Sequence, residues 1–232
     1  IVTTPYDVVK FMVSKSLENF TDKKSPDEIK NLRIADIACG SGIFLTEVLD
    51  YLINYCQDWY EKNKKYDHLE ETYTNTYKLT YKEKKEILTS CLYGVDIDYQ
   101  AVEVAKFSLL LKVLENETEE TVTNEKPVLP SLDNNIINGN SLIDLEMLKD
   151  ETTDELISIN PFSFNNINGG NKFDLIIGNP PYVKTEDMIK LQNKKEVQAY
   201  KSEYYVAYKQ FDKYFLFIQR AIDLVKDSGE VC

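Results

Sequence analysis

Short apolar runs alternate with longer amphipathic stretches along this chain, and this alternation constrains the fold more than any other feature. The apolar runs, each followed by small or polar residues, lie at 32–37, 91–97, 135–138 and 173–178. Between the first three runs, apolar residues recur at roughly helical spacing in Ile43–Leu52 and Ala101–Leu114. The pattern predicts an α/β fold, in which helices cover both faces of a mostly parallel sheet.

The two ends of the chain extend this order. Thr4 and Pro5 suit the N-cap and the first position of a helix, so a helix is expected to begin there. Residues 211–226 are amphipathic and predict a helix that a Ser-Gly pair ends, and 230–232 look like the start of another strand. Residues 61–86 are rich in Lys, Glu, Tyr and Thr with few aliphatics, which predicts a helical insertion on the surface, at about 51–90.

A glycine-rich turn, DIACGSG at 36–42, follows the first predicted strand. Open parallel sheets bind ligands at the carboxyl ends of their strands, and every unusual motif of this chain falls at such an end. The glycines let a ligand approach the backbone, and the start of the next helix favours negative charge nearby. The spacing is neither G-x-G-x-x-G nor a P-loop, which argues against dinucleotide and triphosphate sites. A tight turn without a ligand is the structural alternative.

Polar residues also end the next two strands. Asp96 could accept hydrogen bonds from two ribose hydroxyls, and Ile97 beside it offers an apolar surface to an adenine ring. Asn140 follows the third strand and could accept a hydrogen bond from an adenine amino group. Many strands end in Asp, and Asn-Gly is a common turn. These residues therefore indicate a nucleoside site only in combination with the glycine-rich turn.

The most specific motif follows the fourth strand and consists of Asn179, Pro180, Pro181 and Tyr182. An exocyclic amine on an aromatic ring is a poor nucleophile because its lone pair is delocalised into the ring. The Asn179 side-chain oxygen and the Pro180 carbonyl could accept its two N–H groups and stabilise positive charge developing during methyl transfer. The prolines restrict the backbone, and Tyr182 could stack on a base taken out of its duplex. We therefore predict that all four residues are catalytic.

With these motifs in this order, the chain resembles the N6-adenine DNA methyltransferases of the gamma arrangement. It looks closest to the methylase part of single-chain restriction-modification enzymes of types IIG and IIS. Residues 173–182 resemble the catalytic strand and loop, and 212–218 resemble the helix that lines the methionine end of the cofactor. The resemblance implies a Rossmann-like fold that uses S-adenosylmethionine to methylate N6 of a flipped adenine in duplex DNA, in restriction-modification or phage defence.

The resemblance also implies cofactor contacts from several segments. Thr4 and Pro5 resemble the upstream motif that contacts the methionine part of S-adenosylmethionine. Residues 36–42 resemble the cofactor loop and Asp96 the ribose-binding acid, while Asn140 stands where many members carry Asp. The implied cofactor-binding residues are Thr4, Pro5, Asp36, Ala38, Gly40, Gly42, Asp96, Ile97, Asn140 and Asn179.

The resemblance implies one methyltransferase catalytic domain over residues 1–232, belonging to a longer enzyme. The chain begins without a methionine and ends at Cys232, whereas the family continues through further strands and a target recognition domain. We therefore expect a sheet that is truncated at its C-terminal end. A nuclease domain could share the same full-length chain.

The charge distribution bears on nucleic acid as a partner. The net charge is −12, but residues 115–155 hold twelve acidic side chains and only two lysines. Residues 184–213 hold seven lysines against five acids, which could contact DNA or form an ordinary solvated surface. Because phosphate contacts supply most non-specific affinity, we expect little DNA binding by these 232 residues alone.

Two other functions stay open. Asn-Pro-Pro-Tyr also occurs in enzymes that methylate release-factor glutamine or ribosomal RNA, where a planar amine needs the same acceptors. A methyltransferase fold can also serve as a non-catalytic DNA-binding or assembly module.

Several classes of protein are excluded by composition. Four cysteines without C-x-x-C pairing and a single histidine predict neither a disulfide scaffold nor a metal site, and fit a reducing, bacterial-type cytoplasm. No apolar run approaches the ~18–20 residues of a membrane span, so no membrane association is expected.

Overall fold

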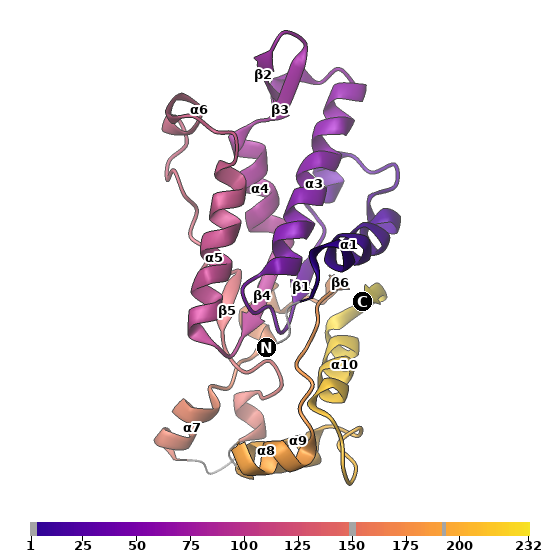
Figure 1. The fold of residues 1–232 in the computed structure, drawn as a ribbon, viewed down its shortest axis with the longest axis vertical. Helices are drawn as coiled ribbons and strands as arrows, with labels where there is room; N and C mark the ends of the chain where they lie inside the picture. Colours follow the sequence, from indigo (N-terminus) through magenta and orange to yellow (C-terminus); the bar gives the residue numbers. More distant parts are fainter. Residues whose placement is uncertain (1–3, 149–151, 192–193) are drawn as a thin grey trace.

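A five-stranded parallel sheet lies at the centre of the computed structural model, which describes residues 4–148, 152–191 and 194–232 (Figure 1). The strands lie in the order β5-β4-β1-β6-β7, and all neighbouring strands pair in parallel. Their bounds are β1 (Ile34–Asp36), β4 (Leu92–Asp96), β5 (Ile136–Asn138), β6 (Phe173–Ile176) and β7 (Val225–Val231). The chain runs from β1 outward to β5 and then returns to β6 on the other side of β1. The switch point, where open sheets bind ligands, therefore lies between β1 and β6.

Helices cover both faces of this sheet, so the predicted α/β architecture is confirmed (Figure 1). One face packs against α1 (Tyr6–Thr21), α3 (Ile43–Lys62), α4 (Tyr81–Cys91) and α5 (Tyr99–Leu114). Beside the other face lies α10 (Lys213–Leu224), and a second core joins it to α7 (Thr153–Ile159), α8 (Thr185–Leu191) and α9 (Lys194–Glu203), which lie below the sheet in Figure 1. Neighbouring side chains of β1 point to opposite faces, with Ile34 in the first core and Ala35 in the second.

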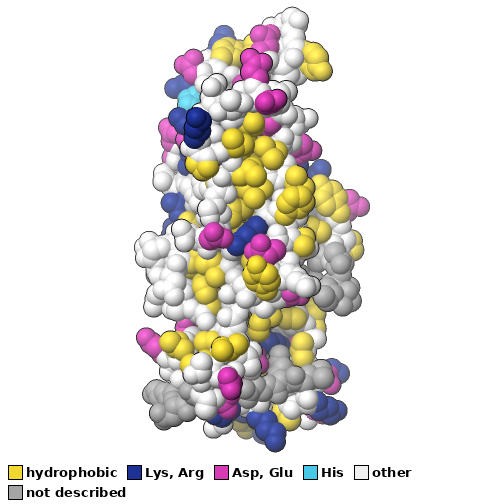
Figure 2. Space-filling view, turned by 90° about the vertical axis from the view of Figure 1, so that its left-hand side faces the viewer, with side chains coloured by type: hydrophobic (Ala, Val, Ile, Leu, Met, Phe, Trp, Pro, Cys, Tyr) yellow, Lys and Arg dark blue, Asp and Glu magenta, His cyan; other side chains and the backbone are white. Residues whose placement is uncertain are grey.

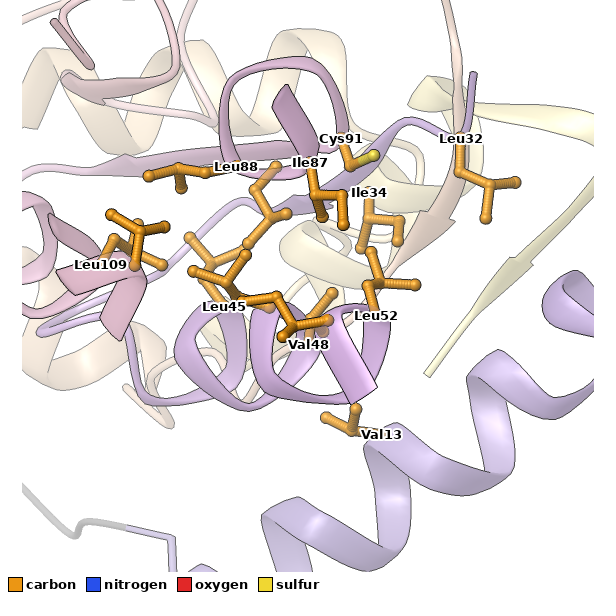
Figure 3. Packing of buried hydrophobic residues seen from close by; sticks show 14 of the residues in the cluster. Val13, Leu32, Ile34, Leu45, Val48, Leu52, Ile87, Leu88, Cys91 and Leu109 are labelled. Atoms are coloured by element: carbon orange, nitrogen blue, oxygen red, sulfur yellow. The ribbon is translucent and has the colours of Figure 1, made fainter. Parts of the chain in front are cut away.

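The first core is built mainly from aliphatic side chains of α3, α4 and α5 lying over the sheet (Figure 3). The labelled side chains include Leu45, Val48 and Leu52 of α3, Ile87 and Leu88 of α4, Leu109 of α5 and Ile34 of β1. Two short helices, α2 (Pro26–Ile29) and α6 (Glu119–Thr123), add to this core: Ile29 of α2 is buried in it and Val122 of α6 packs against it. No helix within the described ranges is long and apolar enough to cross a bilayer.

The insertion at 51–90 is only partly helical, so the prediction is wrong for its central part. α3 runs through to Lys62, and a short 3₁₀ turn leads into an antiparallel hairpin of β2 (Leu69–Tyr73) and β3 (Thr76–Leu79). Asn75 adopts a left-handed conformation with φ 57° between the two strands. Tyr and Thr, which favour strands, dominate the hairpin, and this signal was available in the sequence.

The C-terminal helix and strand also meet earlier than predicted. α10 ends at Leu224, and β7 begins at Val225 and contains the Ser-Gly pair that was expected to stop the helix. The pairing of β7 with β6 shifts register between Phe173 and Leu175. A Cβ on Gly229 would lie 2.7 Å from the Asp174 carbonyl oxygen, so glycine is needed there for this close strand contact. Gly229 therefore marks an irregularity within the strand.

Candidate functional site

The polar residues predicted from the sequence lie at one edge of the sheet. Asp36 ends β1 and Asp96 ends β4, while Asn140 follows β5 and Asn179 follows β6. Parallel strands bring their carboxyl ends to the same edge, which is why residues far apart in the sequence gather there.

Asp96 holds the glycine-rich turn in place. One oxygen of its carboxylate accepts from the backbone N–H of Gly40 at 2.8 Å, and the other accepts from the N–H of Asp98 at 2.9 Å. Asp98 in turn caps α5 by accepting from the N–H groups of two residues in its first turn. Ile97, half exposed beside Asp96, presents an apolar side chain at this edge.

The two glycines of the turn have different roles. Gly42 adopts φ 82°, and a Cβ there would lie 2.9 Å from the Cβ of Ala105, so glycine is required for the approach of the turn to α5. Gly40 adopts φ 52°, but a Cβ there would meet nothing within 4 Å. The backbone at Gly40 therefore borders open space that a ligand could use.

Asp36 is the most perturbed acid at this edge. The residue is 2% exposed, and its carboxylate accepts from the backbone N–H of Ala38 at 3.0 Å. Burial raises the pKa of Asp36 to about 7; the charge of Asp96 adds to the increase, and the Ala38 N–H opposes it. A Cβ on Gly178 would lie 2.5 Å from an Asp36 carboxylate oxygen, so only glycine fits beside it.

The Asn-Pro-Pro-Tyr loop is joined to the N-terminus. The Asn179 side-chain amide donates to the Thr4 hydroxyl at 3.0 Å, which brings two predicted site residues together. Pro5, not Thr4, is the N-cap of α1, and the Thr4 side chain is used by Asn179 instead of capping the helix. The Tyr182 hydroxyl donates to the Asn179 side-chain oxygen at 3.1 Å.

The Tyr182 ring remains accessible from solvent, with 68% of the residue exposed. It stacks on Tyr214 at the start of α10, with ring centroids 5.1 Å apart and planes 16° apart. Pro181 is also exposed, whereas Pro180 faces the adjoining cavity.

A cavity of about 320 Å³ lies at the switch point between β1, β6 and α10. Its lining includes Asp36, Ala38, Gly178 and Pro180 from the strand ends and Tyr214 and Phe217 from α10. The volume lies at the lower end of the range of small-molecule sites, and an apolar lining with a few polar groups is typical of them. The helix at 212–218 thus lines this cavity, beside both sequence motifs.

Asn140 occupies the predicted strand end but lies among internal partners. It is 3% exposed, its oxygen accepts from the N–H of Leu142 at 3.1 Å, and its amide donates to the Ile159 carbonyl and to Glu196, each at 3.3 Å. Its contact with a cofactor adenine stays a prediction. Glu196 and Gly178 were not predicted as site residues. Glu196 belongs to no recognisable motif, and Gly178 lies within 173–182 but acquires its role only through the contact with Asp36.

Comparison with known proteins identifies relatives of this chain. Residues 90–232 match the family described as the Eco57I restriction-modification methylase. The chain is 46% identical over 230 residues to the type II restriction enzyme and methyltransferase RM.Eco57I of Escherichia coli, covering 99% of this chain and 22% of that protein. It is 24% identical over 212 residues to the type II methyltransferase M.BstVI of Geobacillus stearothermophilus, covering 91% of this chain and 29% of that protein. The chain thus spans less than a third of either relative.

Solved structures show the same fold. The type ISP restriction-modification enzyme LlaGI, solved as a nuclease-deletion mutant with a DNA substrate mimic, superposes with a TM-score of 0.62 and 20% identity. That match covers 100% of this chain and 18% of LlaGI. A DrdV–DNA complex superposes with a TM-score of 0.60 and 21% identity over 100% of this chain and 20% of that chain.

Proposed function

Because the chain belongs to the Eco57I restriction-modification methylase family, we propose that it forms the centre of a DNA methyltransferase that modifies N6 of adenine. The observation that carries this proposal is the position of Asn179. Its side chain is fixed by Thr4 at the carboxyl end of β6, beside a cavity that Asp36 and Pro180 line. A site for amine methylation needs such an acceptor next to a pocket for the methyl donor.

The residues at the strand ends fit S-adenosylmethionine as the methyl donor, which supplies an electrophilic methyl group on a sulfonium. Asp96, already the acceptor for two backbone N–H groups, would bind the ribose hydroxyls, and Ile97 would cover the adenine ring. The open space at Gly40 leaves the backbone accessible to the cofactor. The Asp36 carboxylate lines the cavity and would attract the cationic methionine end.

In the proposed reaction Asn179 and Pro180 orient the target amine. The Asn179 side-chain oxygen and the Pro180 carbonyl accept the two N–H groups and favour a tetrahedral nitrogen, whose lone pair can then attack the methyl group. The methyl–sulfur bond would break in the same step, so that the sulfonium leaves as a neutral thioether, and the nitrogen afterwards releases one proton to solvent. In the ligand-free protein the Tyr182 hydroxyl donates to the Asn179 side-chain oxygen, so the entering amine would displace this hydroxyl as the donor.

The proposed partner is duplex DNA with the target adenine flipped out of the helix. Tyr182 is exposed enough to stack on such a base. We propose that residues 1–232 form one methyltransferase domain and that target recognition and nuclease domains lie elsewhere in the same full-length chain. The relatives support this arrangement, because RM.Eco57I is both a restriction enzyme and a methyltransferase and this chain matches 22% of it.

The experiment compares methyl acceptance from labelled S-adenosylmethionine by duplex DNA, ribosomal RNA and release factor, using the complete protein. The proposal predicts label in duplex DNA. Label in RNA or release factor alone would show that the motif serves a different substrate. Cofactor binding without methyl transfer to any of them would indicate a non-catalytic module.

A further inference from the structure

A buried ion pair lies behind the catalytic loop, and its acidic partner, Glu196, belongs to none of the motifs. Glu196 of α9 and Lys213, the first residue of α10, place their charged atoms 3.4 Å apart, with side chains only 7% and 8% exposed. The Glu196 oxygen that meets Lys213 also accepts from the Tyr200 hydroxyl and, at 3.3 Å, from the Asn140 amide. One carboxylate therefore joins α9, α10 and the loop after β5.

The same lysine is tied to the catalytic loop through its backbone. The N–H of Lys213 donates to the carbonyl of Val183 at 2.8 Å, and the N–H of Val183 donates to the Asp212 carboxylate at 3.0 Å. Val183 directly follows Tyr182, and Tyr214, which follows Lys213, stacks on the Tyr182 ring. The start of α10 is thus connected to Tyr182 by two backbone hydrogen bonds and one ring contact.

The electrostatics make this pair sensitive to the loss of one partner. Burial lowers the pKa of Lys213, and the charges of Glu196 and Asp96 oppose that decrease. Glu196 supplies the carboxylate that bonds the ammonium. A buried ion pair that loses one partner leaves an uncompensated charge, whereas a neutral pair of similar shape does not.

We propose that Glu196 and Lys213 are positioning residues that hold the start of α10, and through it Tyr182, in the geometry that methyl transfer needs. The inference rests on the proposed function, because its readout is turnover. It assigns a role to α9, which contributes no residue to the cavity described above.

The test compares three variants of the complete protein with the wild type. Glu196→Gln keeps the shape and an acceptor oxygen but removes the negative charge. Because small displacements of reacting groups have large effects on rate, kcat should fall by about tenfold to a hundredfold. Cofactor affinity should fall less than kcat, because the contacts at Asp96 and Gly40 stay in place even though Tyr214 and Phe217 of α10 line the cavity. Lys213→Met should lower kcat similarly. In the double variant no buried charge is left unpaired, so its kcat should return much of the way to the wild-type value. For the same reason the double variant should fold even if a single variant does not.

The matched control is Glu117→Gln. The Glu117 side chain is 1% exposed and pairs with Lys78 and Lys84, each at 2.6 Å, but it lies beyond the C-terminal end of α5, a helix about 24 Å long whose other end carries Asp98. The control should lower the melting temperature without changing kcat. If Glu196→Gln and Glu117→Gln leave kcat equally unchanged in a protein that methylates DNA, or if the double variant shows no recovery, the positioning role is wrong. Failure of the wild type to methylate adenine would instead refute the proposed function.

Discussion

Cofactor affinity should depend on pH through Asp36. This carboxyl is buried, and its pKa is raised from 3.8 to about 7 in the ligand-free protein, a difference on the order of 4 kcal/mol. A cationic ligand in the cavity would favour the ionised form, so binding below about pH 7 should release a proton. Affinity should therefore rise about tenfold per pH unit between pH 5 and pH 7 and then level off.

The perturbation that isolates Asp36 is Asp36→Asn, which keeps the acceptor for the Ala38 N–H but cannot ionise. Calorimetry with S-adenosylmethionine from pH 5 to pH 7 should give weaker and nearly pH-independent binding in the variant. The ligand's own amino group stays charged in this range, because α-amino groups titrate near ~8. His68, the single histidine, contacts Glu83 in the insertion and is not part of the cavity. An equal pH slope in wild type and variant would refute the assignment of Asp36 to the cofactor site.

The same substitution should have the opposite effect on stability. A raised pKa means that the folded state binds more protons than the unfolded state between about pH 4 and pH 7. The contribution of Asp36 to the free energy of unfolding therefore falls as pH rises through this window and stays low above it. Thermal unfolding of the ligand-free protein should show Asp36→Asn to be the more stable form at pH 8, with a smaller difference at pH 5.

Substitutions at three further positions test the site. Asp96→Ala removes the acceptor of the Gly40 and Asp98 N–H groups and of the proposed ribose hydroxyls. Calorimetry should show that the free energy of cofactor binding weakens by about 2 kcal/mol or more. Unchanged affinity would exclude Asp96 from the site. Gly178→Ala places a Cβ 2.5 Å from Asp36, so the free energy of unfolding measured by denaturant titration should fall by about 1–3 kcal/mol, and a wild-type value would show that Asp36 can move away. Tyr182→Phe should keep the ring stacked on Tyr214 and near-normal turnover. Tyr182→Ala should weaken binding of the flipped base by about 1–3 kcal/mol. Equal effects of the two variants on DNA binding would mean that stacking does not matter.

Much of the fold could be predicted because its determinants are local. The parallel sheet follows from apolar runs that alternate with helical periodicity, and the strands β1, β4, β5 and β6 lie within the predicted runs. The glycine-rich turn was also predictable, since Gly42 is required by a positive φ and by the close contact with Ala105.

The features that sequence analysis missed depend on distant parts of the chain. Threonine is a common N-cap residue, but the Thr4 hydroxyl accepts a hydrogen bond from the side chain of Asn179, which lies 175 positions away. Glu196 lies in a lysine-rich helix that looks solvent-exposed, and only the packing of α9 against Asn140 and Lys213 buries it. Burial of a charged residue is set by tertiary contacts, which short motifs and periodicity do not report.

The central claim is that Asn179 activates the exocyclic amine of adenine. The most direct measurement is mass spectrometry of nucleosides from DNA methylated by the complete protein and by its Asn179→Ala variant, with labelled S-adenosylmethionine. We predict N6-methyladenine as the labelled product, formed at least ~10²-fold more slowly by the variant, whose cofactor affinity should stay near normal. Label in cytosine, or equal rates of adenine methylation by the two proteins, would contradict the account.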